Sequence, residues 1–277
     1  MHLLVLLLVV GCTPEALPLE TESGSSLVDT AAAPPTADCD GAAHCATCDE
    51  AGFWAPTWDI EDPQVLEAVL VDLLSGLTSC HYQDATTWMF TRLDNHDGEV
   101  ECVYTGRWTE ADNEKPNPED MNTEHTWPQS LGAGVPPARC DVHHLFPSDT
   151  QANAVRAAYP FGEVVGGVTW AEGGSQLGLD ADGATVFEPR DPHKGPAARA
   201  ILYFAVTYEM DLGAQGVEVL RDWHVAHPPD PDEIDRTFEI ADYQVHANPF
   251  IVCPDLVERL WGKEGDVPTR PAPAGSR

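Results

Sequence analysis

Apolar residues recur at helical spacing shortly after residue 60. Six of them lie on one side of a helical projection: Val65, Leu66, Val69, Leu70, Leu73 and Leu74. The preceding Asp62-Pro63 pair supplies a capping side chain and a proline that suits the first turn of a helix. The pattern therefore predicts a core helix that starts at Pro63.

Polar and apolar residues alternate differently around residue 98. The turn pair Asp97-Gly98 separates Leu93–His96 from the alternating segment Val100–Thr105. A pair of this kind between two short extended segments indicates a β-hairpin.

The segment from residue 121 to 156 changes pattern three times. Met121–Trp127 can be extended until Pro128 ends it, and a Gly/Pro-rich loop leads to a short apolar stretch at Val142–Phe146. Ser148 or Asp149 is then suited to cap a helix that runs through Gln151–Arg156. The expected order is strand, loop, strand and helix.

Three further helices are expected downstream, and no internal repeat is visible. One opens at Lys194-Gly-Pro196, one has a capping-box-like start at Asp230 with Glu233, and the last starts at Pro254.

The two ends of the chain differ from its middle. An apolar run from Leu3 to Val10 is far shorter than the roughly 20 residues that span a bilayer. Val9-Val10-Gly11-Cys12 resembles a bacterial lipobox, so we interpret residues 1–12 as a lipoprotein-type signal peptide that leaves a lipid on Cys12. The predicted location is the bacterial cell envelope (outer membrane or periplasm), with secretion as the alternative.

The remaining boundaries follow from composition. Residues 13–50 are acidic and rich in Pro, Ser and Ala, which predicts a solvated tether. Residues 266–277 are expected to be a disordered tail. The folded domain is expected over residues 51–265, and 43% of the 277-residue chain is hydrophobic, which is enough for a core.

Eight cysteines in an exported chain indicate disulfides. Removal of Cys12 by lipidation leaves an odd number, so that one thiol is unpaired or forms an intermolecular bond. The sequence does not assign the pairs. The cluster Cys39, His44, Cys45 and Cys48 favours disulfides, with a zinc site as the alternative.

The net charge of −32 argues against a simple nucleic-acid-binding protein, because such proteins carry a basic patch. An enzyme that needs only transient binding could rely on a divalent cation and a few local cationic side chains. Weak affinity at high salt and strict metal dependence are then expected.

Four kinds of functional group lie between Glu124 and Arg156. Glu124-His125-Thr-Trp-Pro-Gln-Ser, Asp141-Val-His-His-Leu-Phe-Pro and Asn153-Ala-Val-Arg156 together offer a carboxylate, imidazoles, an amide oxygen and a guanidinium. Oxygen ligands suit a hard cation, and a neutral imidazole can take a proton from water. This set is suited to metal-assisted cleavage of a phosphodiester.

These segments, together with Tyr104-Thr105-Gly106 and Asn248-Pro249-Phe250, resemble the bacterial endonuclease I family of secreted nucleases over roughly residues 60–262. The resemblance implies an α+β fold with a ββα-metal (His-Me finger) nuclease core in a largely helical single domain. It makes His125 the general base and Glu124 and Asn153 the ligands of Mg²⁺, for which Mn²⁺ can substitute. Threonine in Arg236-Thr237-Phe238, where the family has asparagine, concerns the grip on substrate more than the chemistry.

Most of the residues expected to support the site have two alternative roles. His143 or His144 is expected to orient His125 or the metal shell, and a zinc site that uses both histidines is the rival interpretation. Asp141 is expected to fix a loop. Arg139 or Arg156 is a candidate for binding phosphate, and the alternative for each is a surface or intramolecular ion pair.

The sequence thus predicts an exported Mg²⁺-dependent endonuclease of low sequence preference, acting as a monomer on DNA, with RNA as a further substrate, and leaving 5′-phosphate ends. One rival is a catalytically silent surface module on the same fold. The other is a zinc-dependent hydrolase that uses His125, His143 and His144.

Overall fold

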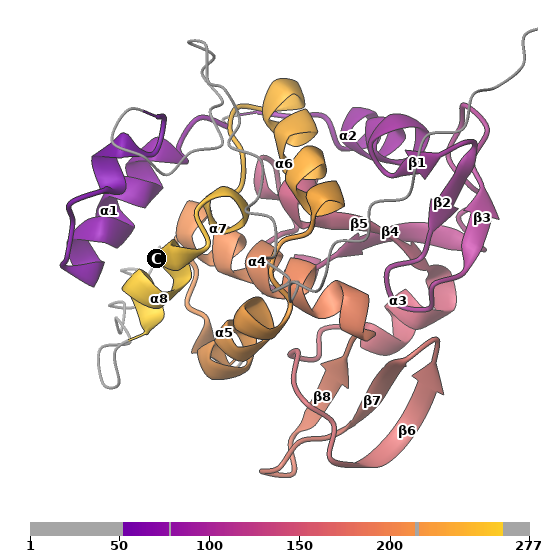
Figure 1. Ribbon diagram of the computed structural model, residues 1–277. Helices are drawn as coiled ribbons and strands as arrows, with labels where there is room; N and C mark the ends of the chain where they lie inside the picture. The colour runs from indigo at the N-terminus through magenta and orange to yellow at the C-terminus, as the bar shows by residue number, and fades with distance from the viewer. Residues whose placement is uncertain (1–51, 78, 214–215, 263–277) are drawn as a thin grey trace, which may run out of the picture. The chain divides into compact units, whose positions relative to one another are not determined.

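A computed structural model describes residues 52–77, 79–213 and 216–262 (Figure 1). The expected signal peptide, tether, tail and Cys39–Cys48 cluster lie outside these ranges. The helices are α1 (Pro63–Leu73), α2 (Tyr82–Trp88), α3 (Thr150–Arg156), α4 (Asp191–Thr207), α5 (Val217–Ala226), α6 (Pro231–Tyr243), α7 (Pro249–Val252) and α8 (Asp255–Trp261). The strands are β1 (Asn95–His96), β2 (Glu99–Glu101), β3 (Trp108–Glu110), β4 (Met121–His125), β5 (Leu145–Asp149), β6 (Gly166–Glu172), β7 (Ser175–Leu179) and β8 (Thr185–Glu188).

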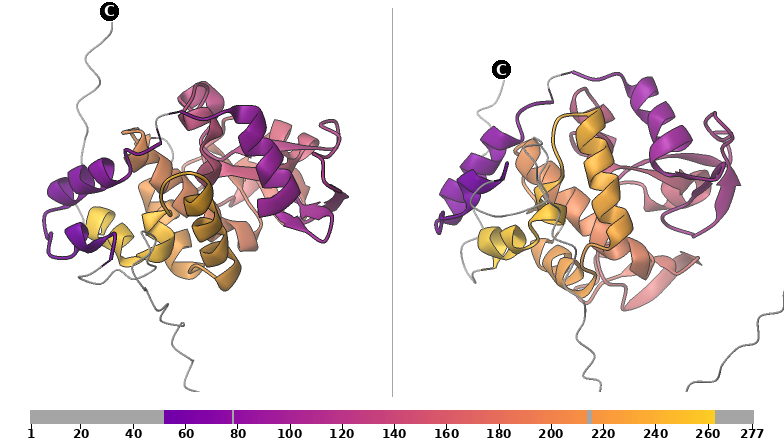
Figure 2. Two further views of the ribbon diagram at one scale, coloured as in Figure 1. Left: turned by 90° about the horizontal axis from the view of Figure 1, so that it is seen from above. Right: turned by 45° about the horizontal axis from the view of Figure 1, so that its top comes forward.

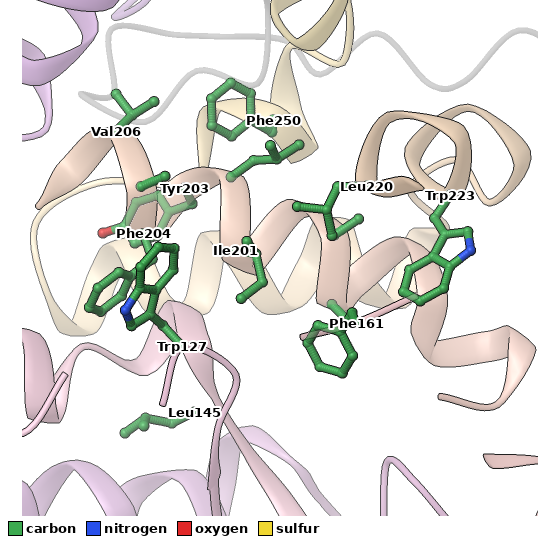
Figure 3. Close-up of a cluster of buried hydrophobic side chains, with 14 of the residues drawn as sticks. Trp127, Leu145, Phe161, Ile201, Tyr203, Phe204, Val206, Leu220, Trp223 and Phe250 are labelled. Carbon is green, nitrogen blue, oxygen red and sulfur yellow. The ribbon is translucent and has the colours of Figure 1, made fainter. Parts of the chain in front are cut away.

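Helix α4 lies at the centre of the described part and contacts α1, α5 and α7 (Figures 1 and 2). Nearly every side chain from His193 to Val206 is buried, which is the pattern of a helix surrounded by other elements. Figure 3 shows side chains from several elements gathered on α4, and Trp127 stacks on Phe204 with ring centroids 5.0 Å apart. This aromatic contact joins the end of β4 to the core helix.

Local capping signals produced α1 and α6 as expected. The Asp62 carboxylate accepts hydrogen bonds from the backbone amides of Gln64 and Val65, and Asp230 accepts one from the amide of Glu233. Both helices also have a proline in the first turn, where the missing N–H costs nothing.

The sheets confirm an α+β fold. Strands β1, β2 and β3 form one antiparallel sheet, β4 and β5 a second, and β6, β7 and β8 a third that the sequence pattern did not predict. The predicted hairpin is present, and Asp97 and Gly98 both have positive φ, as a tight turn between twisted strands requires.

Two element boundaries and one helix cap differ from expectation. Residues Val142–His144 form a 3-10 turn, so β5 starts at Leu145 and extends to Asp149. Helix α4 starts at Asp191, three residues before Lys194, with Pro192 in its first turn. The Asp149 carboxylate does not cap α3, because it binds the Arg107 guanidinium at 2.6 Å.

A disulfide links Cys80 and Cys140, which are 60 residues apart in sequence. It ties the start of α2 to the loop between β4 and β5. Cys102 is a free, buried thiol, and Cys253 is disulfide-bonded. Among the described residues, no helix combines the length and apolar character needed to cross a bilayer.

Candidate active site

Strand β4 carries Glu124 and His125 at its end. It pairs antiparallel with β5, so that Glu124 lies opposite Phe146 and His125 opposite Leu145. Consecutive strand residues point to opposite faces, and the contacts of the two side chains differ accordingly. Both are buried, with 2% and 5% of their surface exposed. The strand stops at His125.

The Glu124 carboxylate is held from two sides. Its Oε1 accepts a hydrogen bond from the Tyr104 hydroxyl at 2.9 Å, and Arg156 Nε lies 3.3 Å from the same oxygen. Burial raises the pKa of Glu124, and the Arg156 cation and the Tyr104 hydroxyl oppose that rise. Neither contact uses Oε2.

Arg156 has no exposed surface. It donates from Nη2 to the carbonyl oxygen of Thr126 at 2.6 Å and from Nη1 to that of Ala157 at 3.0 Å. Its Nε contact with Glu124 is an ion pair without hydrogen-bond geometry. Of the two interpretations of Arg156, the structure therefore shows the intramolecular ion pair, since a phosphate would have no access to the guanidinium.

Helix α3 places Asn153 against β4. The Asn153 amide nitrogen donates to Asn122 Oδ1 at 2.7 Å and to the carbonyl oxygen of Thr123 at 3.2 Å. Asn122 and Glu124 are two residues apart on the strand and share a face. Asn153 and Glu124 therefore belong to the same α3–β4 junction, and the amide oxygen of Asn153 takes no part in either hydrogen bond.

The His125 imidazole has a defined tautomer. Its Nε2 lies 3.1 Å from the carbonyl oxygen of Arg139, which can only accept, so Nε2 carries the proton. Nδ1 is then an acceptor, and the Gln129 amide lies 3.3 Å from it. Burial lowers the pKa of His125 to about 3, and the charges of His144 and Arg139 act in the same direction. The ring is neutral at physiological pH.

His143 and His144 are packed behind this strand end. His143 Nε2 lies 2.8 Å from the carbonyl oxygen of His246, and His144 Nε2 lies 2.7 Å from that of Ala138. The His144 ring meets the His125 ring edge to face at 5.5 Å. Within the described ranges, no three His, Cys, Asp or Glu side chains are arranged to hold a metal ion, so the geometry gives no support to a zinc site of the three histidines.

Asp141 is a fully buried anchor for the loop between the strands. Its Oδ2 accepts from the hydroxyls of Tyr203 at 2.8 Å and Tyr208 at 2.7 Å, and its Oδ1 accepts from the Gln244 amide at 3.0 Å and the His143 amide at 3.1 Å. Burial raises the pKa of Asp141, but His143, His144 and these hydrogen bonds outweigh it and lower the pKa. Asp141 therefore fixes a loop, as expected.

A known protein family matches the whole segment that carries this site. The family model for Endonuclease I matches residues 72–255, which include every residue described above. The chain belongs to the endonuclease I family. It is therefore a nuclease, a hydrolase of phosphodiester bonds.

Curated relatives carry the same kind of name. The nuclease is 30% identical over 221 residues to an extracellular ribonuclease of Bacillus subtilis (strain 168), a match that covers 71% of this chain and 74% of the relative. An extracellular ribonuclease of Bacillus amyloliquefaciens is 30% identical over 225 residues, covering 71% of this chain and 73% of the relative. A periplasmic deoxyribonuclease of Aeromonas hydrophila is 34% identical over 111 residues, covering 40% of this chain and 46% of the relative.

Arg139 differs from Arg156 in its exposure and partners. It is partly exposed, and its Cζ lies 4.4 Å from the centre of the Tyr82 ring. In the part of the nuclease that the structure describes, no carboxylate pairs with Arg139 and its Nε has no hydrogen-bond partner. The Arg139 guanidinium is thus a candidate for contact with a phosphate.

Two tyrosines of the site were not predicted. Tyr104 lies in a segment that resembles the family, yet nothing in the sequence pairs it with Glu124, 20 residues away. Tyr82 stacks on His125 with ring centroids 5.6 Å apart, although 43 residues separate them. Only packing of α2 and the β2–β3 connection onto β4 reveals these contacts.

A cavity of about 350 Å³ lies beside α6. Its wall includes the carboxylates of Asp232, Asp235 and Glu239, and neither Glu124, His125 nor Asn153 lines it. A concentration of negative charge disfavours a phosphodiester. Glu124, His125 and Asn153 do not form this cavity, although His143 and Arg236 are in its wall.

Proposed function

We propose that this nuclease is an exported, metal-dependent endonuclease that hydrolyses phosphodiester bonds of DNA, with RNA as a second substrate, at little sequence preference and leaving 5′-phosphate ends. The observation that carries the proposal is His125: a neutral imidazole whose Nδ1 is an acceptor, at the end of the strand that also bears Glu124.

Glu124 and Asn153 fit a hard divalent cation, Mg²⁺ with Mn²⁺ as a substitute. The two contacts of Glu124 leave Oε2, and the two hydrogen bonds of Asn153 leave its amide oxygen. Oxygen ligands and a small number of protein groups are typical of Mg²⁺, which retains several waters. When bound, the cation supplies Lewis acidity that stabilises the negative charge developing on the phosphate and the leaving oxygen.

Arg156 and Tyr104 position the carboxylate of Glu124 and favour its ionised form. Buried hydrogen bonds and an adjacent cation limit the rotation of a side chain that lies 2% exposed. We assign Arg156 this positioning role and not a contact with phosphate.

His125 is proposed to take a proton from the attacking water at Nδ1. The carbonyl oxygen of Arg139 keeps the proton on Nε2, so that the opposite nitrogen is the basic one. A pKa of about 3 makes a weak base, but the negative charge of a phosphodiester bound beside the ring favours the imidazolium and raises the pKa. The Gln129 amide marks the direction from which Nδ1 is approached.

Arg139 is proposed to contact the scissile phosphate, because its side chain is partly exposed and has no carboxylate partner among the described residues. His143, His144 and Asp141 support this loop from behind. With a net charge of −32, the chain gains little long-range attraction for nucleic acid. Affinity for nucleic acid is therefore expected to be weak, above all at high salt.

Export rests on the N-terminal pattern and on the names of the relatives, which are extracellular or periplasmic proteins. A lipid on Cys12 would attach the monomeric enzyme to the cell envelope. Because one relative is named a ribonuclease and another a deoxyribonuclease, both RNA and DNA are to be tested as substrates.

The test is cleavage of supercoiled plasmid and of single-stranded RNA at low salt, with Mg²⁺ or with EDTA. His125→Ala should cut about 10²- to 10⁴-fold more slowly, the usual cost of losing a general base. His81→Ala is the matched control, because its side chain is 74% exposed. Near wild-type cleavage by His125→Ala would show that His125 is not the general base.

Metal binding is measured separately by titration calorimetry with Mn²⁺. Glu124→Gln and Asn153→Ala should weaken binding, whereas His125→Ala should leave it unchanged. A folded wild-type protein that cleaves neither substrate would favour the rival surface module, and activity sustained by trace zinc in place of Mg²⁺ would favour the zinc hydrolase.

A further inference from the structure

Tyr82, at the first position of α2, touches two residues of the proposed site at once. Its ring stacks on the His125 imidazole with a centroid distance of 5.6 Å and an interplanar angle of 30°, and the Arg139 guanidinium lies over the ring at 4.4 Å. We propose that Tyr82 is a positioning residue that fixes both the plane of His125 and the place of Arg139. This inference rests on the roles proposed above for those two residues.

The polar contacts of His125 do not fix its ring during the reaction. Nε2 is bonded to the carbonyl oxygen of Arg139, but Nδ1 has to release the Gln129 amide before it can accept a proton from water. One hydrogen bond then remains, about which the ring can swing. The two rings in contact with it, Tyr82 and the buried His144, prevent that motion.

Arg139 depends on Tyr82 more directly. Among the described residues the guanidinium has no carboxylate partner, so the tyrosine ring is the group that holds it beside His125. A cation over an aromatic ring gains about 0.5–1 kcal/mol at an exposed site. That is enough to favour one position of a long side chain while leaving its N–H groups for an anion.

Tyr82 is itself well anchored. The Cys80–Cys140 disulfide joins the residue two before Tyr82 to the residue that follows Arg139. The ring is therefore held from its backbone.

The test compares Tyr82→Leu with Tyr243→Leu. Tyr243 stacks on Trp88, at the other end of the same helix, with centroids 4.1 Å apart, so its loss also removes an aromatic stack from α2. Each variant is assayed for plasmid cleavage and for its urea unfolding midpoint. Tyr82→Phe is the conservative variant that keeps the ring and should retain most of the activity.

Misplacement of a reacting group by about 1 Å can cost 10²-fold, so kcat of Tyr82→Leu should fall about 10- to 100-fold. KM should rise about 2- to 5-fold, the equivalent of the lost cation–π contact, and this rise should vanish when Arg139→Ala is already present. Tyr243→Leu should change the unfolding midpoint similarly without either kinetic effect.

The outcomes separate this inference from the proposed function. If the wild type cleaves, His125→Ala does not, and Tyr82→Leu equals Tyr243→Leu, only the role of Tyr82 is overturned. If the wild type does not cleave or does not need His125, the proposed function fails and this inference fails with it. Should Tyr82→Leu not fold, Tyr82→Met replaces it, and wild-type kinetics in that variant would overturn the role.

Discussion

Replacement of Asp141 by alanine is expected to destabilise the protein strongly. The carboxylate is fully buried and accepts hydrogen bonds from the Tyr203 and Tyr208 hydroxyls, the Gln244 side-chain amide and the His143 backbone amide. Alanine leaves all four donors without this acceptor; those of Tyr203 and His143 are fully buried, whereas those of Tyr208 and Gln244 are partly buried. A buried stranded donor costs about 1–3 kcal/mol, so the two buried donors together should cost about 4 kcal/mol.

Asparagine at this position should be milder, because the two donors on Oδ2 are hydroxyls. If the new amide nitrogen faces the tyrosines, their oxygens can accept from it, while the amide oxygen keeps the Gln244 and His143 donors. The charge on the hydrogen bonds is lost and the buried Tyr203 O–H loses its acceptor, so the total cost should be about 2–3 kcal/mol, below that of alanine. The order of stability should be wild type, Asp141→Asn, Asp141→Ala.

Urea unfolding followed by fluorescence, without reductant so that the disulfide stays closed, measures both variants. With a denaturant slope of about 2–3 kcal/mol/M, a loss of 4 kcal/mol lowers the midpoint by roughly 1.3–2 M. A loss below about 1 kcal/mol for Asp141→Ala would refute the view that this carboxylate holds the loop. Nuclease activity should fall in the folded variant too, because the same loop carries the Arg139 carbonyl that binds His125.

Arg156→Met should cost about 3–5 kcal/mol in urea unfolding, since it leaves the buried carboxylate that it pairs with uncompensated; an unchanged midpoint would contradict the ion pair. Gly173→Ala should destabilise the protein more than Gly183→Ala, because a methyl group at residue 173 would meet the Thr105 carbonyl oxygen whereas residue 183 has open space around it. Both variants carry the cost of a positive φ. Equal losses of stability would show that the backbone at residue 173 moves to accommodate the methyl group. Burial lowers the pKa of His143 to about 4, so the unfolded chain, titrating near 6.5, takes up the proton first and stability falls as the pH drops from about 6.5 to 4. This one group should remove about 2 kcal/mol by pH 5, visible as a lower melting temperature, and a flat stability between pH 7 and 5 would contradict it.

Local signals explain which parts of the fold were predictable. The caps at Asp62 and Asp230 act within three residues of themselves, so the starts of α1 and α6 could be read directly. The β6–β8 sheet and the start of β5 depend on pairing between strands, which no short pattern specifies. The start of α4 was predicted wrongly because Pro196 was expected in the first turn of the helix, whereas it lies about one turn further in.

The same distinction applies to the site. Glu124, His125 and Asn153 could be named from the sequence motifs and from the resemblance to the family. The structure confirms the strand–loop–strand–helix order on which they lie. The assignment of Arg156 could not be settled, because its burial depends on how α3 packs against β4. Tyr82 and Tyr104 are contributed by distant segments that meet the strand only in the folded protein.

The anchoring of Asp141 has a consequence for synthesis. Its side-chain partners Tyr203, Tyr208 and Gln244 lie 62, 67 and 103 residues further along the chain. A ribosome has therefore made His125 and the loop beside it well before the groups that hold that loop exist. The growing polypeptide is expected to lack an assembled cleavage site while it is still next to messenger and ribosomal RNA, and to acquire one only after the last third of the chain has been released and has folded.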